Sequence, residues 1–206
     1  MALRRTLRSA LPVLLLALLL PLSACGAPAD ARPSSSASSA TGTRTPTPDP
    51  RPTPASSKGP ARNVPRPILP EAAKQNTEEG FEAFTQYWLD TVTYAFESGD
   101  VEPLKLGSAA SCKVCVEFTE EARKLHTEGG WATGPRWTVQ NFFSDMIRDP
   151  EGRLMGRYLG LESPSADYNS EGSIKRSFPG DPSGTHQEIY ASFEADRWVT
   201  LETGNL

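Results

Sequence analysis

Hydrophobic and polar residues follow four successive patterns along this chain of 206 residues. A continuous apolar run extends from Leu11 to Leu20, and residues 26–70 then contain hardly any large apolar side chain. From Phe81 onwards apolar residues recur at helical spacing, and from Trp137 they alternate with polar ones. The patterns predict a short apolar segment, a disordered linker, a group of helices and then a group of strands.

The first predicted helix is the longest. Asn76 with Glu79, or alternatively Thr77, is suited to cap its N-terminus. Gly99 is expected to end it, because glycine readily adopts the left-handed conformation that follows a last turn. Its apolar face consists of five residues at helical spacing: Phe81, Phe84, Trp88, Val92 and Ala95.

Two shorter helices are expected next. Asp100 is suited to cap a helix that ends at Leu106, with Pro103 tolerated in its first turn. Ser111 is expected to cap a third helix, which Gly129-Gly130 would end.

Antiparallel strands are predicted beyond residue 130. Residues 149–152 have turn chemistry, and residues 162–185, rich in serine, glycine, proline and aspartate, are expected to form a long loop. Three helices followed by an antiparallel sheet would make residues 71–206 an α+β globular domain. The predicted strands are residues 137–144, 154–161, 186–193 and 198–202.

Residues 1–24 have the features of a bacterial secretory signal. Arginines precede an apolar run that is too short for a stable membrane-spanning helix, and small residues follow it. Leu22-Ser23-Ala24-Cys25 resembles the lipobox of bacterial lipoproteins, in which the cysteine thiol receives a diacylglycerol that carries acyl chains such as palmitate. The resemblance implies cleavage before Cys25, a membrane partner held through this lipid, and an extracytoplasmic location in the cell envelope. The alternative is an ordinary signal followed by an unmodified cysteine.

Residues 25–70 are predicted to be a lipid-anchored, disordered linker. Proline occupies nearly every second position from Pro46 to Pro54, and serine, threonine and alanine dominate the rest. Such a segment cannot bury enough apolar surface to offset the entropy lost on ordering. We expect a stalk that holds the domain away from the membrane, and O-glycosylation of the stalk is left open.

The net charge excludes two classes of partner. The chain carries a formal charge of −4, and loss of three arginines with residues 1–24 lowers it to −7. Nucleic-acid binding depends on basic patches, and adhesion to anionic lipid also needs positive charge. We therefore expect no nucleic-acid partner, and attachment to the membrane through the lipid alone.

The segment from Phe84 to Asp100, with Cys112-Lys113-Val114-Cys115 after it, resembles actinobacterial lipoproteins that contain a domain of unknown function. The order of the predicted elements is similar to the nuclear transport factor two-like, or SnoaL-like, fold. This resemblance implies three helices packed on one curved antiparallel sheet, a cone-shaped half-barrel around an apolar cavity. Members of that superfamily bind ligands, catalyse reactions or associate with proteins, and often dimerise through their sheets, so a homodimer is a further expectation.

Cys112 and Cys115 admit three interpretations. A structural disulfide at the start of the third helix is favoured, because the spacing suits a bridge and the expected compartment is oxidising. A thioredoxin-like redox pair would need a preceding strand, where a helix and a loop are predicted here. A metal site would need two further ligands, and neither His126 nor His186 has a recognisable ligand spacing.

No residue stands out as catalytic, and no cofactor or metal is expected. Strand alternation places His186, Glu188 and Tyr190 on one face, which would be either the cavity face or the solvent face. Aromatic side chains that recur at helical or strand spacing more often form a core than a pocket. The residues that could line a pocket are Trp88, Trp137, Phe143, Tyr158, His186, Glu188, Tyr190 and Trp198.

Three functions are therefore considered. The preferred one is a membrane-anchored binding or interaction module without enzymatic activity, whose partner is a small molecule or an envelope protein. The alternative is a small isomerase-like or hydrolase-like enzyme that uses inward-facing His186 and Glu188 as a general acid–base pair. An envelope thiol–disulfide protein is the third.

Overall fold

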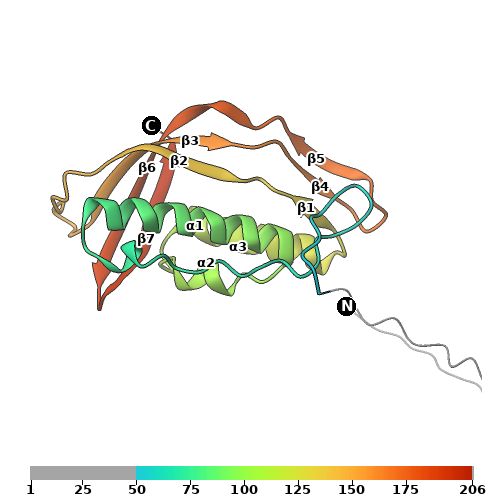
Figure 1. Ribbon diagram of the computed structural model, residues 1–206, viewed down its shortest axis with the longest axis horizontal. Coiled ribbons are helices and arrows are strands. Elements are labelled where there is room, and N and C mark those ends of the chain that lie inside the picture. Colours follow the sequence, from blue (N-terminus) through green and yellow to red (C-terminus); the bar gives the residue numbers. More distant parts are fainter. Residues whose placement is uncertain (1–49, 206) are drawn as a thin grey trace, which may run out of the picture. The chain divides into compact units, whose positions relative to one another are not determined.

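A computed structural model describes residues 50–205 of the chain (Figure 1). The predictions made for residues 1–24, for Cys25 and for the linker up to residue 49 lie outside the described residues. The described part is α+β, with its helices before its strands. The elements are η1 (Ala72–Lys74), α1 (Glu78–Ser98), α2 (Glu102–Leu106), α3 (Lys113–Thr127), β1 (Trp131–Thr133), β2 (Trp137–Phe143), β3 (Leu154–Glu162), β4 (Ser165–Tyr168), β5 (Ile174–Phe178), β6 (Asp181–Glu194) and β7 (Arg197–Asn205).

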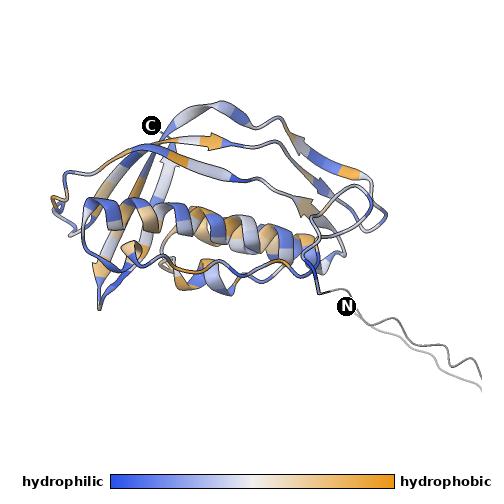
Figure 2. Ribbon diagram, in the orientation of Figure 1, coloured by the Kyte–Doolittle hydropathy of each residue, from blue (hydrophilic) through white to orange (hydrophobic). Residues whose placement is uncertain are grey.

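Helix α1 begins and ends at positions set by local chemistry. The Thr77 hydroxyl accepts a hydrogen bond from the Gly80 amide over 3.1 Å, so Thr77 is the cap rather than Asn76. Gly99 ends the helix with φ of +79°, in the left-handed region, as predicted. The hydrophobic residues of α1 recur along the helix between hydrophilic ones (Figure 2).

The two shorter helices start slightly later than predicted. The Asp100 carboxylate accepts a hydrogen bond from the Glu102 amide, although Val101 is the capping position of α2. Cys112, and not Ser111, caps α3, because its sulfur accepts from the Cys115 amide. Leu125 and Gly130 mark the end of α3, where their backbones are joined by a hydrogen bond.

The strands form two antiparallel sheets, so the predicted single curved, cone-shaped sheet is wrong. One sheet has four strands in the order β2-β3-β6-β7, and the other has three in the order β1-β4-β5. The chain crosses between them after β1, after β3 and after β5. Helices α1 and α3 lie along one side of the strands (Figure 1).

Proline and glycine residues explain the division into two sheets. Pro135 and Pro164 lie in two of the three crossings and have no amide hydrogen to donate to a ladder. Gly180 lies in the third with φ of +74°, and a side-chain carbon there would come within 2.6 Å of the Glu162 carbonyl oxygen. The ladders are interrupted at these positions.

The long loop predicted over residues 162–185 is also wrong, because it contains β4 and β5 and the start of β6. All four residues of β4 are buried, and all five of β5 are exposed. Neither strand therefore shows the alternation between buried and exposed positions by which half-buried strands are recognised.

The main core lies between α1, α3 and the four-stranded sheet. Phe81 stacks on Trp198 with ring centroids 4.6 Å apart, and Phe142 meets Phe81 edge-on. The Trp198 indole donates to the Gln75 carbonyl over 3.1 Å, which ties β7 to the segment before α1. Trp131, Ala166 and Tyr168 form a smaller cluster on the three-stranded sheet.

Residues 50–70 pack on the domain, so the predicted linker ends too late at residue 70. Thr53 and Arg62 form an antiparallel bridge, and the Trp131 indole donates to the Ser56 carbonyl over 2.8 Å. Ala55 packs against the smaller cluster, beside Trp131. We call residues 50–70 the N-terminal arm.

Candidate functional site

A cavity of about 660 Å³ lies between α1, α3 and the two sheets. It is partly open to solvent. Its lining combines aromatic and apolar side chains with a group of carboxylates, contributed by Trp88, Leu89, Phe96, Val114, Phe118, Glu121, Pro135, Trp137, Tyr158, Gly160, Glu162, Ser165, Asp167, Arg176, Phe178, Asp181, Thr185, Gln187, Thr203, Gly204 and Asn205.

Aromatic side chains from both helices and from β2 meet at one wall of the cavity. Phe118 of α3 lies at the centre, with its ring centroid 6.4 Å from Trp88, 6.2 Å from Phe96 and 6.3 Å from Trp137. Trp88 and Phe96 lie on the apolar face of α1. Such rings offer flat apolar surface and electron-rich faces to a bound molecule.

Tyr158 supplies a hydroxyl group to the cavity. It lies on the inner face of β3 and is 4% exposed. Burial raises the pKa of its phenol to about 12, while hydrogen bonding with Thr203 lowers it by less. Tyr158 is therefore a neutral group at physiological pH, able to donate and to accept a hydrogen bond.

Two carboxylates lie side by side at the end of β3. Glu162 pairs in register with Asp181, the first residue of β6. Burial and the neighbouring Asp181 charge raise the pKa of Glu162, and hydrogen bonding with the Trp137 side chain opposes this shift. No lysine or arginine among residues 50–205 lies within 4.0 Å of the Glu162 carboxylate, whose charge thus has no cationic partner there.

Asp181 is held in place by its own turn. Its carboxylate accepts a hydrogen bond from the Thr185 hydroxyl over 2.7 Å and from the amides of Ser183 and Gly184. These bonds lower the pKa of Asp181, the Thr185 hydroxyl contributing most. Asp181 is therefore a fixed negative charge next to Glu162 at neutral pH.

Arg176 of β5 is already engaged by two other carboxylates of the lining. Its guanidinium lies 2.8 Å from the Asp167 carboxylate and 3.5 Å from that of Glu121. It also lies over the Phe178 ring, 5.8 Å from the centroid. The positive charge of Arg176 is thus neutralised before any ligand arrives.

Ser165 is a buried polar group without a partner. It is 8% exposed, and its hydroxyl oxygen has no hydrogen-bond partner among the described residues. It begins β4 and lines the cavity, two residues before Asp167. A buried hydroxyl without a hydrogen bond is costly, and a ligand in the cavity could supply one.

The structure places the eight predicted pocket residues in four different environments. Trp88, Trp137 and Tyr158 line the cavity. Trp198 is part of the core, and Phe143 is 59% exposed at the end of β2. The remaining residues, His186, Glu188 and Tyr190, lie on the face of β6 opposite to buried Ile189 and Ala191.

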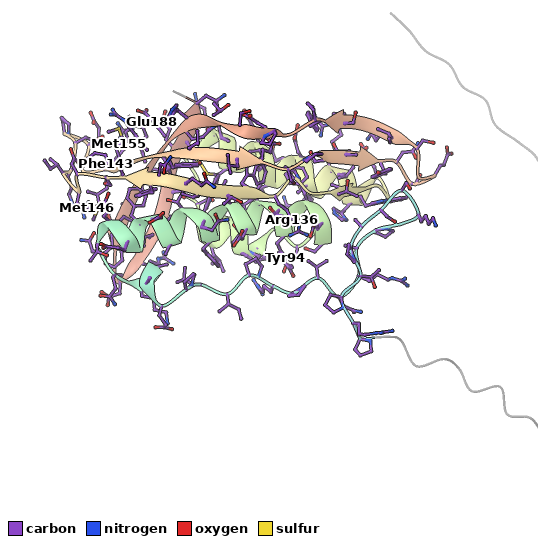
Figure 3. All side chains as sticks on the ribbon, turned by 45° about the horizontal axis from the view of Figure 1, so that its top comes forward. Tyr94, Arg136, Phe143, Met146, Met155 and Glu188 are labelled. Carbon is purple, nitrogen blue, oxygen red and sulfur yellow. A yellow bond between two sulfur atoms is a disulfide. The ribbon has the colours of Figure 1, made fainter. Side chains whose placement is uncertain are left out.

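The outer face of β6 carries its own contacts. Glu188 forms an ion pair with Arg157 over 3.3 Å and accepts from the Tyr190 hydroxyl. The Arg153 guanidinium lies over the Tyr190 ring, 4.5 Å from the centroid. In Figure 3, Glu188 lies beside Met155 at the end of the sheet away from Arg136. His186 and Glu188 are therefore not the inward-facing pair that the enzyme hypothesis needs.

Cys112 and Cys115 form a disulfide, and both are 1% exposed within the core. His126 bonds the Phe96 carbonyl through its ring nitrogen over 2.8 Å, which is a structural contact between α3 and α1. Within residues 50–205, no three His, Cys, Asp or Glu side chains are grouped so as to hold a metal ion. None of the helices in that range combines the length and hydropathy needed to cross a bilayer.

The polar residues of the cavity were missed by sequence reasoning. Glu162, Ser165, Asp167, Arg176 and Asp181 all fall in the segment that was predicted to be a loop. One signal could have identified a strand there. The run Ile174-Lys175-Arg176-Ser177-Phe178 places apolar residues at its two ends on the same side of an extended chain.

Comparison with solved structures finds distant likenesses. The crystal structure of the intermembrane space region of the chloroplast protein ARC6 is similar at 13% identity, covering 63% of this chain and 96% of that one, with a TM-score of 0.47. The structure of Aln2 from a Streptomyces species is similar at 8% identity, covering 60% of this chain and 88% of that one, with a TM-score of 0.37. Comparison with curated proteins finds no match.

Comparison with protein families gives a match over most of the chain. Residues 51–204 match the family described as "Family of unknown function (DUF6318)". The match includes all of the N-terminal arm except residue 50, and both sheets and the cavity lining except Asn205. The protein therefore belongs to the DUF6318 family.

Proposed function

We propose that this protein is an extracytoplasmic lipoprotein of the actinobacterial cell envelope, anchored through Cys25, whose domain binds a small molecule in the cavity described above. The observation that carries the proposal is the cavity itself. Its volume of about 660 Å³ is within the range of small-molecule sites, and most of its lining surface is apolar, with polar and charged side chains among it.

The positions of the histidines favour binding over catalysis. The chain has two histidines, and neither lines the cavity. His126 is used in a contact between helices, and His186 is exposed on the outer face of β6. An acid–base pair formed by His186 and Glu188 would act on the outer face, away from the concave surface that could enclose a substrate.

Burial of the disulfide argues against thiol–disulfide exchange. A reactive disulfide needs a sulfur atom that a thiolate can approach, whereas Cys112 and Cys115 are both packed in the core. A structural role fits this burial.

The lipid anchor is supported by the sequence around Cys25. An apolar run is followed directly by Leu22-Ser23-Ala24-Cys25, and the net charge of −7 of the mature chain does not favour attraction to an anionic membrane. Mass spectrometry of the native protein tests this part of the proposal. We expect an N-terminal Cys25 carrying acyl chains, and an intact leader or an unmodified thiol would contradict it.

The binding part is tested with the mature chain, beginning at residue 25 and carrying C25S to remove the anchoring thiol. In ¹⁵N-resolved NMR spectra of the protein recorded with a small-molecule library, we expect some compounds to shift the indole N–H signals of Trp88 and Trp137 and to leave that of Trp131 unchanged. Trp131 is a matched control, because it lies in the smaller cluster outside the cavity. Failure of every compound to perturb the cavity tryptophans would contradict the binding function.

A further inference from the structure

We infer that the ligand of this cavity is a protonated amine attached to an apolar or aromatic body. The inference rests on the proposed binding function and adds the chemical class of the ligand. Four features carry it: the balance of charge in the lining, the unpaired Glu162 carboxylate, the aromatic wall and the unpartnered Ser165 hydroxyl.

The lining has an excess of negative charge. Glu121, Glu162, Asp167 and Asp181 face the cavity, and Arg176 is the one basic side chain in its lining. Arg176 is bound by Asp167 and Glu121, which leaves Glu162 and Asp181 uncompensated. An anionic ligand would be repelled by these carboxylates, whereas a cation would be attracted.

Glu162 and Asp181 form the part of the lining that a cation would stabilise most. The two residues are paired in register across β3 and β6, and the Asp181 charge disfavours ionisation of Glu162. A positive charge near both carboxylates would relieve this repulsion and favour the ionised form of Glu162. Asp181 needs no rearrangement, because Thr185 and two amides already hold it.

The aromatic wall fits the remainder of such a ligand. Trp88, Phe96, Phe118 and Trp137 give an apolar surface that can hold an aliphatic chain or a ring. Trp137 pairs in register with Glu162 across β2 and β3, and both line the cavity, so aromatic surface and carboxylate are adjacent. A cation near an indole face gains further attraction from the ring electrons.

Ser165 distinguishes an amine from a cation without N–H groups. Its hydroxyl is buried, lines the cavity and has no partner among residues 50–205. A hydroxyl oxygen can accept a hydrogen bond from an ammonium N–H, and Tyr158 can accept another. A bound amine would thus satisfy a polar atom that the domain itself leaves without a bond.

The test uses three probes that share an indole ring and differ in charge: tryptamine, tryptophol and indole acetate. Their binding to the mature C25S chain is measured by isothermal titration calorimetry at neutral pH. We expect tryptamine to bind about tenfold more tightly than tryptophol, and indole acetate to bind more weakly than either.

Three variants locate the effect. E162Q is expected to abolish the preference for tryptamine over tryptophol, while leaving the affinity for tryptophol unchanged. E171Q removes an exposed carboxylate outside the cavity and serves as the matched control. We expect it to leave the affinities for all three probes unchanged. S165A is expected to weaken the binding of tryptamine, because it removes the acceptor for an ammonium N–H. Thermal unfolding of each variant verifies that the fold is retained.

The outcomes separate the two proposals. Tryptophol or indole acetate binding as tightly as tryptamine, or an unchanged preference in E162Q, would overturn the amine inference and leave the binding function standing. Absence of binding by all three probes at millimolar concentration would count against both.

Discussion

The Arg136 guanidinium donates a hydrogen bond to the Glu97 carboxylate over 2.6 Å, which joins helix α1 to the residue before strand β2. The Glu97 side chain is 9% exposed, whereas Arg136 is largely open to solvent. The pair therefore matters mainly because it compensates a carboxylate that has been removed from water.

Removal of Arg136 is expected to destabilise the domain. R136A leaves Glu97 buried without a partner, and we expect the free energy of unfolding to fall by about 1–2 kcal/mol, less than for a fully buried pair because water reaches Arg136. Urea denaturation measures the change. R123A, which removes an exposed arginine of α3, is the control, and the double variant E97Q/R136A should be more stable than R136A. Equal losses in R123A and R136A would refute this role.

Replacement of Thr200 by valine is expected to stabilise the domain. Thr200 is fully buried in β7, and its hydroxyl has no hydrogen-bond partner among the described residues. T200V keeps the shape of the side chain and is expected to raise the free energy of unfolding by about 1 kcal/mol. T203V on the same strand should destabilise instead, because the Thr203 hydroxyl donates to the Glu188 carbonyl. If T200V and T203V changed the stability in the same direction, the hydrogen bonding of the two hydroxyls would not explain their effects.

The disulfide is expected to contribute modestly to stability. It closes a very short loop between Cys112 and Cys115, for which chain entropy predicts about 2 kcal/mol. Comparing the variants C112S/C115S and C112A/C115S separates this contribution from helix capping, because a serine hydroxyl at the capping position of α3 can replace the sulfur as acceptor. We expect C112S/C115S to lose less stability than C112A/C115S in chemical denaturation, and the reverse order would contradict a capping role.

The raised pKa of Glu162 predicts a dependence on pH. A carboxyl whose pKa is higher in the folded state binds its proton more tightly there, so ionisation of Glu162 destabilises the unliganded domain above its ordinary pKa of 4.5. E162Q should therefore be more stable than the parent chain at neutral pH, and this advantage should disappear as the pH falls below 4.5. Denaturation curves across this pH range test whether the stability difference between E162Q and the parent chain shrinks on acidification, with E171Q as the control. An advantage that grows on acidification would contradict it.

The N-terminal arm is expected to respond to a charge placed beneath it. A55D would bring a carboxylate against Trp131, Ala166 and Tyr168 and should loosen the arm at a cost of about 1–3 kcal/mol. Trypsin should then cleave faster after Arg62. S57D, at an exposed position of the same arm, should leave the cleavage rate unchanged. Equal protection of A55D and the parent chain would show that the arm does not depend on this contact.

The helices were predictable because their ends depend on neighbouring residues. Thr77 and Gly99 bound α1 through hydrogen bonds and backbone angles that the local sequence sets. The same reasoning misplaced the caps of α2 and α3 by one residue, at Val101 and Cys112, which is within the usual uncertainty of helix ends.

The strands were harder because their partners are distant in sequence. Alternation correctly grouped His186, Glu188 and Tyr190 on one face, but alternation alone does not reveal which face meets the core. For β4 and β5, burial depends on the sheet they join rather than on their own pattern. Ser165, Asp167 and Arg176 of the cavity lining were missed together with these two strands, whereas Trp88 on α1 and Trp137 on β2 followed from local periodicity.

The crossings after β1, β3 and β5 carry the chain back and forth between the two sheets that line the cavity. Each sheet keeps its ladder hydrogen bonds within itself, and short stretches of chain containing Pro135, Pro164 and Gly180 join them. Glu162 and Asp181 belong to the four-stranded sheet, whereas Asp167 and Arg176 belong to the three-stranded one. A molecule that touches all of these charged side chains must therefore span both sheets, so its binding would fasten one sheet to the other.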